Sequence, residues 1–151
     1  MLTAPTTDNL TLNVTLETLV RASIEATFES VIVQMGRQNE TPDGKPLPMV
    51  LEAWPGGRWY RDLGGDNGHF WGQVQAIKRP TLLEICGPLF MSSPVISNVQ
   101  YRLKEVDGGT LIVFRHSAFG FVPDEYREGL AAGWTPLVDR IRAAAERADT
   151  R

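Results

Sequence analysis

Cysteine and histidine are the residue types that this chain has least of. A single cysteine, Cys86, stands among 151 residues, so no disulfide can form within the chain, which fits a reducing compartment. Its neighbours in the sequence are apolar, which predicts a buried, unreactive thiol. The two histidines are His116 and His69, and His69 stands beside a turn, where solvent is expected around it. We therefore expect no metal site and no cofactor.

Long apolar runs and an excess of positive charge are also absent. The first residues, "MLTAPTTDNL", lack the basic start and apolar core of a signal peptide, and no run approaches the roughly 20 apolar residues of a membrane span. The net charge of −3 offers no general attraction for nucleic acid. We expect a cytoplasmic protein with neither a membrane nor a nucleic acid as partner. The length fits a single domain at 10–147, between flexible tails at 1–9 and 148–151.

The hydrophobic period changes along the chain. "LTLNVTLETLV" alternates apolar and polar residues, which predicts a strand. "SIEATFESVIVQMG" has helical spacing, with Ser23 suited to cap the start and Gly36 to end the helix. "NETPDGKPLP" is rich in turn residues and predicts a loop. Turn signals then separate six further strands: PMVLEAW, RWYRDL, HFWGQVQAI, LLEICG, ISNVQYRLKEV and TLIVFRHSAF.

The last segment, "PDEYREGLAAGWTPLVDRIRAAAERA", predicts a long amphipathic helix with Pro123 at its first position. An internal proline removes one backbone hydrogen bond and clashes with the preceding turn, at about 3 kcal/mol. Pro136 therefore predicts a kink or break near 133–136, with Thr135 capping the second part. This helix is the expected cover for one face of an antiparallel sheet. Its apolar stripe consists of Tyr126, Leu130, Trp134, Leu137 and Ile141.

The segment "GGRWYRDLGGDNGHFWGQVQ", residues 56–75, is rich in glycine. No Gly-Lys-Ser/Thr follows, which excludes a phosphate-binding loop, and the acidic residues lack the spacing of a calcium loop. The pattern predicts two strands and a turn, with Asn67-Gly68 as a hairpin signal. Gly72 falls inside a strand, where a missing side chain admits a close neighbour.

Five sequence segments, in their order along the chain, resemble those of a known superfamily. They are "VRASIEATFES", "PGGRW", "GQVQAIKRPTLLEI", "GTLIVFRHSAFG" and "PDEYREGLAAGW". The chain is similar, from about residue 12 to 145, to the SRPBCC superfamily (Bet v 1-like or START-like), and within it to the Hsp90 ATPase activator homologue (AHSA1-like) domain. The resemblance implies an α+β helix-grip fold, in which a curved antiparallel sheet wraps a long C-terminal helix and leaves a cavity. Relatives mostly bind apolar or amphipathic small molecules, and no catalytic motif is common to them.

Alternation along the strands assigns side chains to this cavity. In "VQYRLK" the apolar set with Tyr101 faces inward, and the family pattern places Phe114 and His116 inward on the last strand. On the strand "HFWGQVQAI", polarity favours an inward orientation for Phe70, Gly72, Val74 and Ala76, and an outward one for the residues between them. The expected ligand is a small amphipathic or hydrophobic molecule. Its predicted contacts are Trp59, Arg61, Phe70, Val74, Tyr101, Phe114, His116 and Trp134.

Four points stay open. Arg61 on a concave face needs a carboxylate or a bound anion, and Glu84 is one candidate partner. His116 is either a ligand contact or, as we favour, a core histidine bonded to another strand or helix. If the protein is an enzyme of the cyclase or hydrolase kind, His116 or Glu84 would be its acid or base. If it acts on a protein, as a co-chaperone-like regulator or a homodimer, Tyr60 and Trp71 form the expected outer surface.

Overall fold

The computed structural model describes residues 10–149. The predicted N-terminal tail, 1–9, lies outside the described residues, and the last helix continues through 148–149 of the predicted C-terminal tail. The elements in chain order are β1 (Thr11–Val20), α1 (Ile24–Met35), β2 (Val50–Leu51), β3 (Arg58–Gly64), β4 (Asn67–Lys78), β5 (Leu82–Gly87), β6 (Val95–Val106), β7 (Gly109–Gly120) and α2 (Asp124–Asp149).

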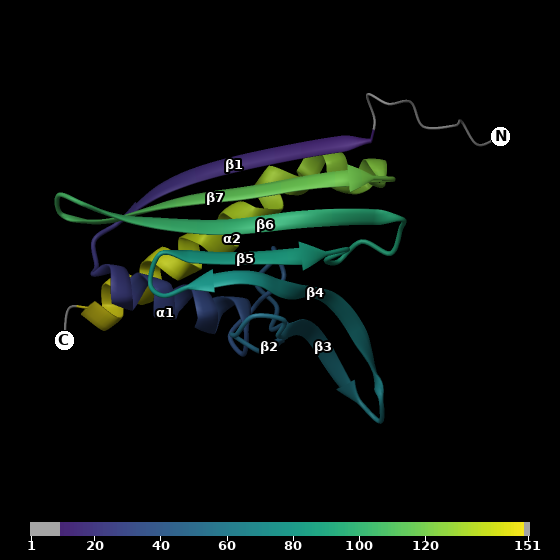
Figure 1. Ribbon diagram of the computed structural model, residues 1–151, viewed down its shortest axis with the longest axis horizontal. Helices are drawn as coiled ribbons and strands as arrows, with labels where there is room; N and C mark the ends of the chain where they lie inside the picture. The colour runs from purple at the N-terminus through teal and green to yellow at the C-terminus, as the bar shows by residue number, and fades with distance from the viewer. Residues whose placement is uncertain (1–9, 150–151) are drawn as a thin grey trace.

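The strands form one antiparallel sheet in the order β1-β7-β6-β5-β4-β3-β2. Figure 1 shows α1 and α2 on one face of this sheet, and the β3–β4 hairpin extending beyond it. The predicted α+β helix-grip fold is confirmed, since a curved antiparallel sheet wraps a long C-terminal helix. No helix in the described part of the chain is long and apolar enough to cross a membrane.

The two faces of the sheet differ as the alternation predicts. Tyr101 and its register partner Phe114 are fully buried under the helices, with ring centroids 5.1 Å apart. Gln100, Glu84 and Arg102 lie on the opposite face, where Gln100 donates to a carboxylate oxygen of Glu84 at 2.6 Å. On β5, Leu83 and Ile85 therefore face inward and Glu84 faces outward, and Cys86, on the same face as Glu84, is half-buried rather than buried as predicted.

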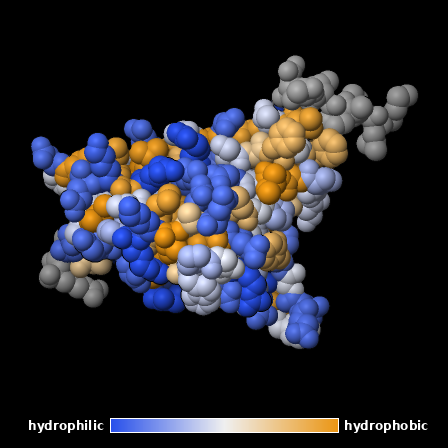
Figure 2. Space-filling model, viewed as in Figure 1, coloured by the Kyte–Doolittle hydropathy of each residue, from blue (hydrophilic) through white to orange (hydrophobic). Residues whose placement is uncertain are grey.

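Figure 2 views the outer face and shows apolar side chains gathered where β6 begins and β7 ends. Ile96 and Phe119 are register partners there, and their side chains are 58% and 60% exposed.

The ends of α1 follow the capping rules. The Ser23 hydroxyl accepts from the backbone N–H of Ala26 at 3.1 Å, and the N–H of Gly36 closes the last turn on the carbonyls of Ile32 and Val33. The chain then makes a loop, 36–49, that contains the predicted one, 39–48. It returns to the helix end, where Met49 donates its N–H to the Gly36 carbonyl at 3.0 Å.

The break predicted in α2 is absent. The helix is continuous through Pro136, and the Thr135 hydroxyl donates to the Ala131 carbonyl at 2.9 Å instead of capping a second segment. Burial of the apolar stripe explains this outcome, because Trp134, Leu137 and Ile141 flank Pro136 and are all buried against the sheet and α1. Tertiary packing of that stripe offsets the hydrogen bond that the proline removes.

Two extra residues in β4 change which side chains face the helices. Trp59 pairs with Gly72 and Tyr60 pairs with Phe70, so Trp71 has no partner on β3. A second irregularity falls between Val74 and Ala76 in the pairing with β5. Each bulge shifts the alternation by one residue. The inward orientation predicted for Phe70 is therefore wrong, and its side chain is 45% exposed on the outer face.

Candidate functional site

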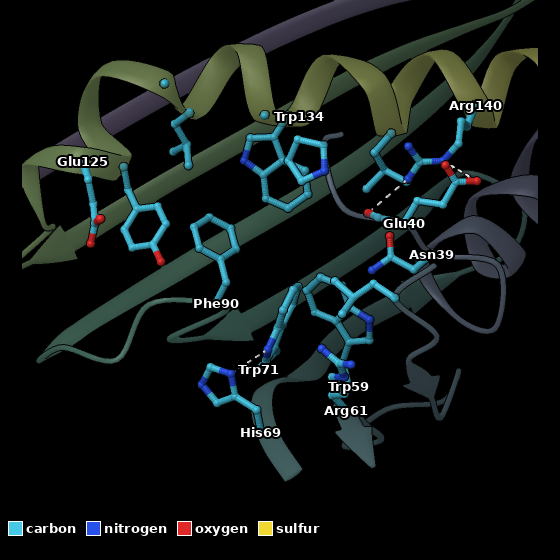
Figure 3. A pocket seen from close by; sticks show the side chains of 17 residues that line it. Asn39, Glu40, Trp59, Arg61, His69, Trp71, Phe90, Glu125, Trp134 and Arg140 are labelled. Atoms are coloured by element: carbon cyan, nitrogen blue, oxygen red, sulfur yellow. Dashed lines mark hydrogen bonds and ion pairs between the residues drawn. The ribbon is translucent and has the colours of Figure 1, made fainter. Parts of the chain in front are cut away.

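The main cavity lies between α2, the loop 36–49 and the inner face of the β3–β4 hairpin. Its volume is about 480 Å³, and it opens to solvent. Phe90, in the connection between β5 and β6, closes one side, as Figure 3 shows. We call this space the hairpin pocket, because β3 and β4 supply its charged and aromatic wall through Trp59, Arg61, His69 and Trp71.

One face of α2 forms the opposite wall. Glu125, Gly129, Gly133, Leu137 and Arg140 all line the pocket, at intervals of three or four residues. Figure 3 shows Glu125 and Arg140 at opposite ends of this stretch of helix. Two of these positions are glycines, and a Cβ added at Gly129 would meet no atom within 4 Å. The pair therefore hollows the helix surface at the pocket.

The aromatic lining is a chain of ring contacts. Trp71 packs edge-on against Trp59, with centroids 5.0 Å apart, and Phe90 packs against Trp71 at 5.8 Å. Phe90 also contacts Tyr126 at 5.1 Å and Trp134 at 6.3 Å. These spacings are those of favourable aromatic pairs, so the wall is held in place without a ligand.

Trp59 is fixed from behind as well. Its indole N–H donates to the Met35 carbonyl at 2.8 Å, at the end of α1, and its side chain is fully buried. A buried indole needs such an acceptor, because an unpaired N–H loses its hydrogen bonds to water. Trp59 therefore ties the hairpin to α1 while one part of its ring faces the pocket.

The charged groups of the pocket are unevenly paired. The Arg140 Nε lies 3.9 Å from a carboxylate oxygen of Glu40, and its Nη2 donates to the Glu40 carbonyl at 3.5 Å. Arg61 is half-buried, and within residues 10–149 it makes no hydrogen bond or ion pair. The proposed pairing of Arg61 with Glu84 is wrong, since Glu84 lies on the other face of the sheet.

His69 faces the pocket because of the bulge at Trp71. The Trp71 indole N–H donates to His69 Nδ1 at 3.0 Å. An indole nitrogen can only donate, so Nδ1 is the acceptor and the neutral ring carries its proton on Nε2. In the described part of the chain nothing bonds to that Nε2–H, which makes it a donor available to a ligand. The expectation that Trp71 faces outward is wrong, and His69, which was expected to be solvated beside a turn, is half-buried and lines this solvent-open pocket.

His116 is a core histidine, as favoured from the sequence. It is fully buried, accepts at Nδ1 from the Trp134 indole N–H at 3.0 Å, and shares a 2.8 Å hydrogen bond between Nε2 and the Ser97 hydroxyl. Burial disfavours the charged ring and lowers the pKa of His116 to about 4. Both nitrogens are thus occupied by the protein itself, and His116 does not line the hairpin pocket.

The structure separates the predicted contact residues into two groups. Trp59, Arg61 and Trp134 line the hairpin pocket. Val74, Tyr101 and Phe114 lie in the packed core, and His116 is buried on β7, whereas Phe70 is on the outer face. Burial raises the pKa of the Tyr101 hydroxyl, which meets the Met35 sulfur at 3.3 Å rather than a cavity.

Sequence reasoning missed Phe90, Tyr126, Glu125, Arg140 and the residues of the loop 36–49. The glycine pair at 129 and 133 was the available signal. Each glycine inside a helix costs about 1 kcal/mol relative to alanine, and four-residue spacing puts both on one face. Two glycines on the inner side of a helix therefore indicate a space beside it that no side chain fills.

No group of three metal-binding side chains occurs among residues 10–149. Within the pocket, the titratable side chains are Glu40, His69, Glu125 and Tyr126, together with the two arginines. The arrangement suits recognition of a flat molecule by ring contacts, with cationic and neutral donors at its edges.

A curved antiparallel sheet that wraps a long C-terminal helix, with a pocket between them, defines the helix-grip class of the SRPBCC superfamily. CalU16 from Micromonospora echinospora is similar at 18% identity and a TM-score of 0.64, over 91% of this chain and 75% of that one. StfQ, a di-domain ARO/CYC protein from the steffimycin biosynthetic pathway, is similar at 10% identity and a TM-score of 0.68, over 96% of this chain and 54% of that one. A Chromobacterium violaceum protein is similar at 14% identity and a TM-score of 0.68, over 89% of this chain and 96% of that one.

The family model described as "Activator of Hsp90 ATPase homolog 1-like protein" matches residues 44–146, and the chain belongs to this family. Among proteins with curated functions, none matches. The structural likenesses stand below 25% identity, so they show the fold and leave function to the site.

Proposed function

We propose that this protein binds a small amphipathic molecule, with a flat aromatic body and one anionic group, and that it does so without catalysing a reaction. The proposal rests on the hairpin pocket and above all on Arg61, a cation without a protein partner in the described part of the chain, beside an aromatic wall.

The size of the pocket supports a ligand of ordinary metabolite or drug dimensions. Small-molecule sites measure roughly 300–1,000 Å³, and the hairpin pocket holds about 480 Å³. Because the pocket opens to solvent, water fills it when no ligand is bound. A flat apolar ligand would release that water from the rings of Trp71, Phe90 and Tyr126, at about 25 cal/mol for each Å² of apolar surface covered.

The edge of the pocket supports an anionic group on the ligand. Arg61 and His69 are register partners on β3 and β4, so their side chains leave the same face of the hairpin. The guanidinium of Arg61 and the Nε2–H of His69 are both donors. A half-buried guanidinium gains most from a carboxylate, sulfonate or phenolate, because charge-assisted hydrogen bonds are the strong ones.

The acid–base alternative lacks support at this site. His116 and Glu84, the two groups considered for it, lie in the core and on the outer face of the sheet respectively. The outer surface expected for a protein partner, at Tyr60 and Trp71, loses Trp71, which points into the pocket, and keeps Tyr60, the register partner of the exposed Phe70.

Anilinonaphthalene sulfonate, a fluorescent aromatic anion, matches the proposed chemistry and serves as the probe. Wild-type protein is expected to bind it saturably with enhanced fluorescence. Gly129→Leu fills the hollow in α2 and is expected to weaken binding by at least about tenfold, because the added side chain occupies ligand space. Leucine also favours the helix over glycine by about 1 kcal/mol, so the fold is expected to persist. Ala132→Leu, on the exposed side of the same helix, is the matched control.

Arg61→Gln is expected to weaken binding of the sulfonate by about tenfold, through the loss of a charge-assisted contact. Arg102→Gln removes the same charge from the outer face and should leave binding unchanged. Indole N–H signals in NMR locate the probe, since Trp59, Trp71 and Trp134 line the pocket whereas Trp54 is 58% exposed elsewhere. Equal binding by Gly129→Leu and wild type, or a shift confined to the Trp54 signal, would end the proposal.

A further inference from the structure

A second cavity lies on the other side of Arg140 from the hairpin pocket. It has a volume of about 390 Å³ and sits where the end of α1 meets the C-terminal half of α2 and the loop 36–49. Three arginines line it, and they come from three different places: Arg37 follows α1, Arg140 lies within α2, and Arg147 lies in the last turn of α2.

The charge of this cavity is opposite to that of the chain. Among residues 10–149, three arginines and one carboxylate, Glu40, line the cavity and give a net charge of +2, since 3 − 1 = 2, whereas the whole chain carries −3. Cations near the end of a helix are favoured by its dipole, which accounts for Arg37 and Arg147 in part. The dipole does not account for Arg140, which lies well inside α2.

Arg140 is the best indicator of a missing partner. Its Nε is buried and makes no hydrogen bond, and the nearest carboxylate oxygen of Glu40 is 3.9 Å away. Its Nη2 reaches the Glu40 carbonyl only at 3.5 Å, the long limit of a hydrogen bond. The side chain is 20% exposed, so water alone compensates this guanidinium poorly.

Neutral donors complete the lining. Gln34 is 5% exposed and donates through Nε2 to the Gln38 side-chain carbonyl at 3.0 Å. That bond fixes the orientation of the Gln38 amide and leaves its NH₂ group as a donor. Arginine forks with added amide donors are the groups that proteins use for phosphate oxygens.

We infer that this second cavity binds a small multivalent anion, and that a phosphate ester is the chemical class it fits. The phosphate would lie among Arg37, Arg140 and Arg147 and would supply the acceptor that the Arg140 Nε lacks. The volume exceeds that of a bare phosphate, so the ester's organic part has room in the same cavity.

The second cavity shares part of its wall with the hairpin pocket. Asn39, Glu40 and Arg140 line both cavities and form the partition between them. A phosphate that draws Arg140 away from Glu40 changes the wall of the hairpin pocket. If phosphate changes the affinity of the hairpin pocket for its ligand by some factor, that ligand must change the affinity for phosphate by the same factor, because coupling between two sites is reciprocal.

Titration calorimetry with inorganic pyrophosphate tests the site at fixed ionic strength. Saturable binding is expected in wild-type protein, and Arg147→Gln and Arg140→Gln should each weaken it by about tenfold. Arg115→Gln, which removes an exposed arginine from the outer face of the sheet, is the matched control and should bind as wild type does. NMR signals of the Gln34 and Gln38 side-chain amides should shift with pyrophosphate, while the Trp54 indole signal stays in place.

Citrate in place of pyrophosphate separates phosphate recognition from a general preference for anions, and weaker binding of citrate is expected. Absence of saturable heat at millimolar pyrophosphate, or equal weakening by Arg115→Gln and Arg147→Gln, would overturn the inference. The hairpin pocket is tested by its own probe and variants, so either proposal can fail while the other holds.

Discussion

Two tryptophan–histidine pairs occur in this protein, and they differ only in their surroundings. Trp134 donates to His116 and Trp71 donates to His69, in both cases from the indole N–H to Nδ1 at 3.0 Å. In the core, the Ser97 hydroxyl occupies the remaining nitrogen of His116. In the hairpin pocket, within residues 10–149, the remaining nitrogen of His69 has no such partner.

The comparison shows how one local contact can serve structure or recognition. A buried network is stable only when every donor and acceptor is satisfied, and the inner pair meets that condition. The outer pair has the same fixed tautomer but leaves one N–H at the pocket surface. We therefore assign the inner pair to stability, whereas the outer pair is the one that the proposed ligand would contact.

The largest expected difference between the pairs is in stability. Trp134→Ala should lower the free energy of unfolding by about 3–5 kcal/mol, because it removes buried contacts with Phe114 and His116 and leaves a cavity. Trp71→Ala should cost about half as much, since Trp71 is only half-buried. Urea unfolding of both variants measures the difference, and equal losses would contradict the division of roles.

The core histidine, His116, should also make the stability of the protein depend on pH. The pKa of His116 is about 4 in the folded protein and about 6.5 when unfolded, so the unfolded chain binds the proton first. His116 therefore contributes its full stabilisation above pH 6.5 and loses it as the pH falls to 4, by about 3 kcal/mol in all.

Urea unfolding at several pH values measures this loss. His116→Leu should flatten the profile between pH 6.5 and 4. Glu52 does not interfere above pH 4.5, because its ion pair with Arg58 lowers its pKa to about 2. A profile that His116→Leu leaves unaltered would show that another group titrates in this window.

The smallest expected effect concerns the proton on His69. Trp71→Phe keeps the ring in the pocket but removes the indole N–H, so His69 is no longer restricted to the Nε2–H form. Nitrogen chemical shifts of the ring should show one tautomer in wild type and a mixture in the variant, with a change in stability below about 1 kcal/mol. A wild-type ring that already shows a mixture would mean that the Trp71 contact does not select the tautomer.

Much of the fold followed from the sequence, because its signals are local and redundant. Alternation identified the strands, Ser23 and Gly36 marked the ends of α1, and the terminal stripe identified α2. Continuity of α2 through Pro136 could not be foreseen, since it depends on packing that a segment cannot reveal alone. The same packing explains why the helix absorbs the cost of the proline.

The site was harder to predict, because strand alternation alone cannot locate a bulge. One unpaired residue, Trp71, exchanges the faces of β4, so His69 enters the pocket while Phe70 leaves it. The sequence order around Gly72 is equally consistent with a regular hairpin. Only pairing with β3 and β5 reveals the extra residue, and pairing is a long-range property.

The glycines at 129 and 133 leave the main chain of α2 as the floor of the hairpin pocket. A helical backbone has no side chain to rotate away, so that floor keeps one shape whatever lies on it. Adjustment to ligands of different shape must therefore come from the opposite side, where Arg61 has no partner among residues 10–149 and can change rotamer. The helix should therefore determine which ligand shapes fit the pocket, and the hairpin should determine how much variation in shape is accepted.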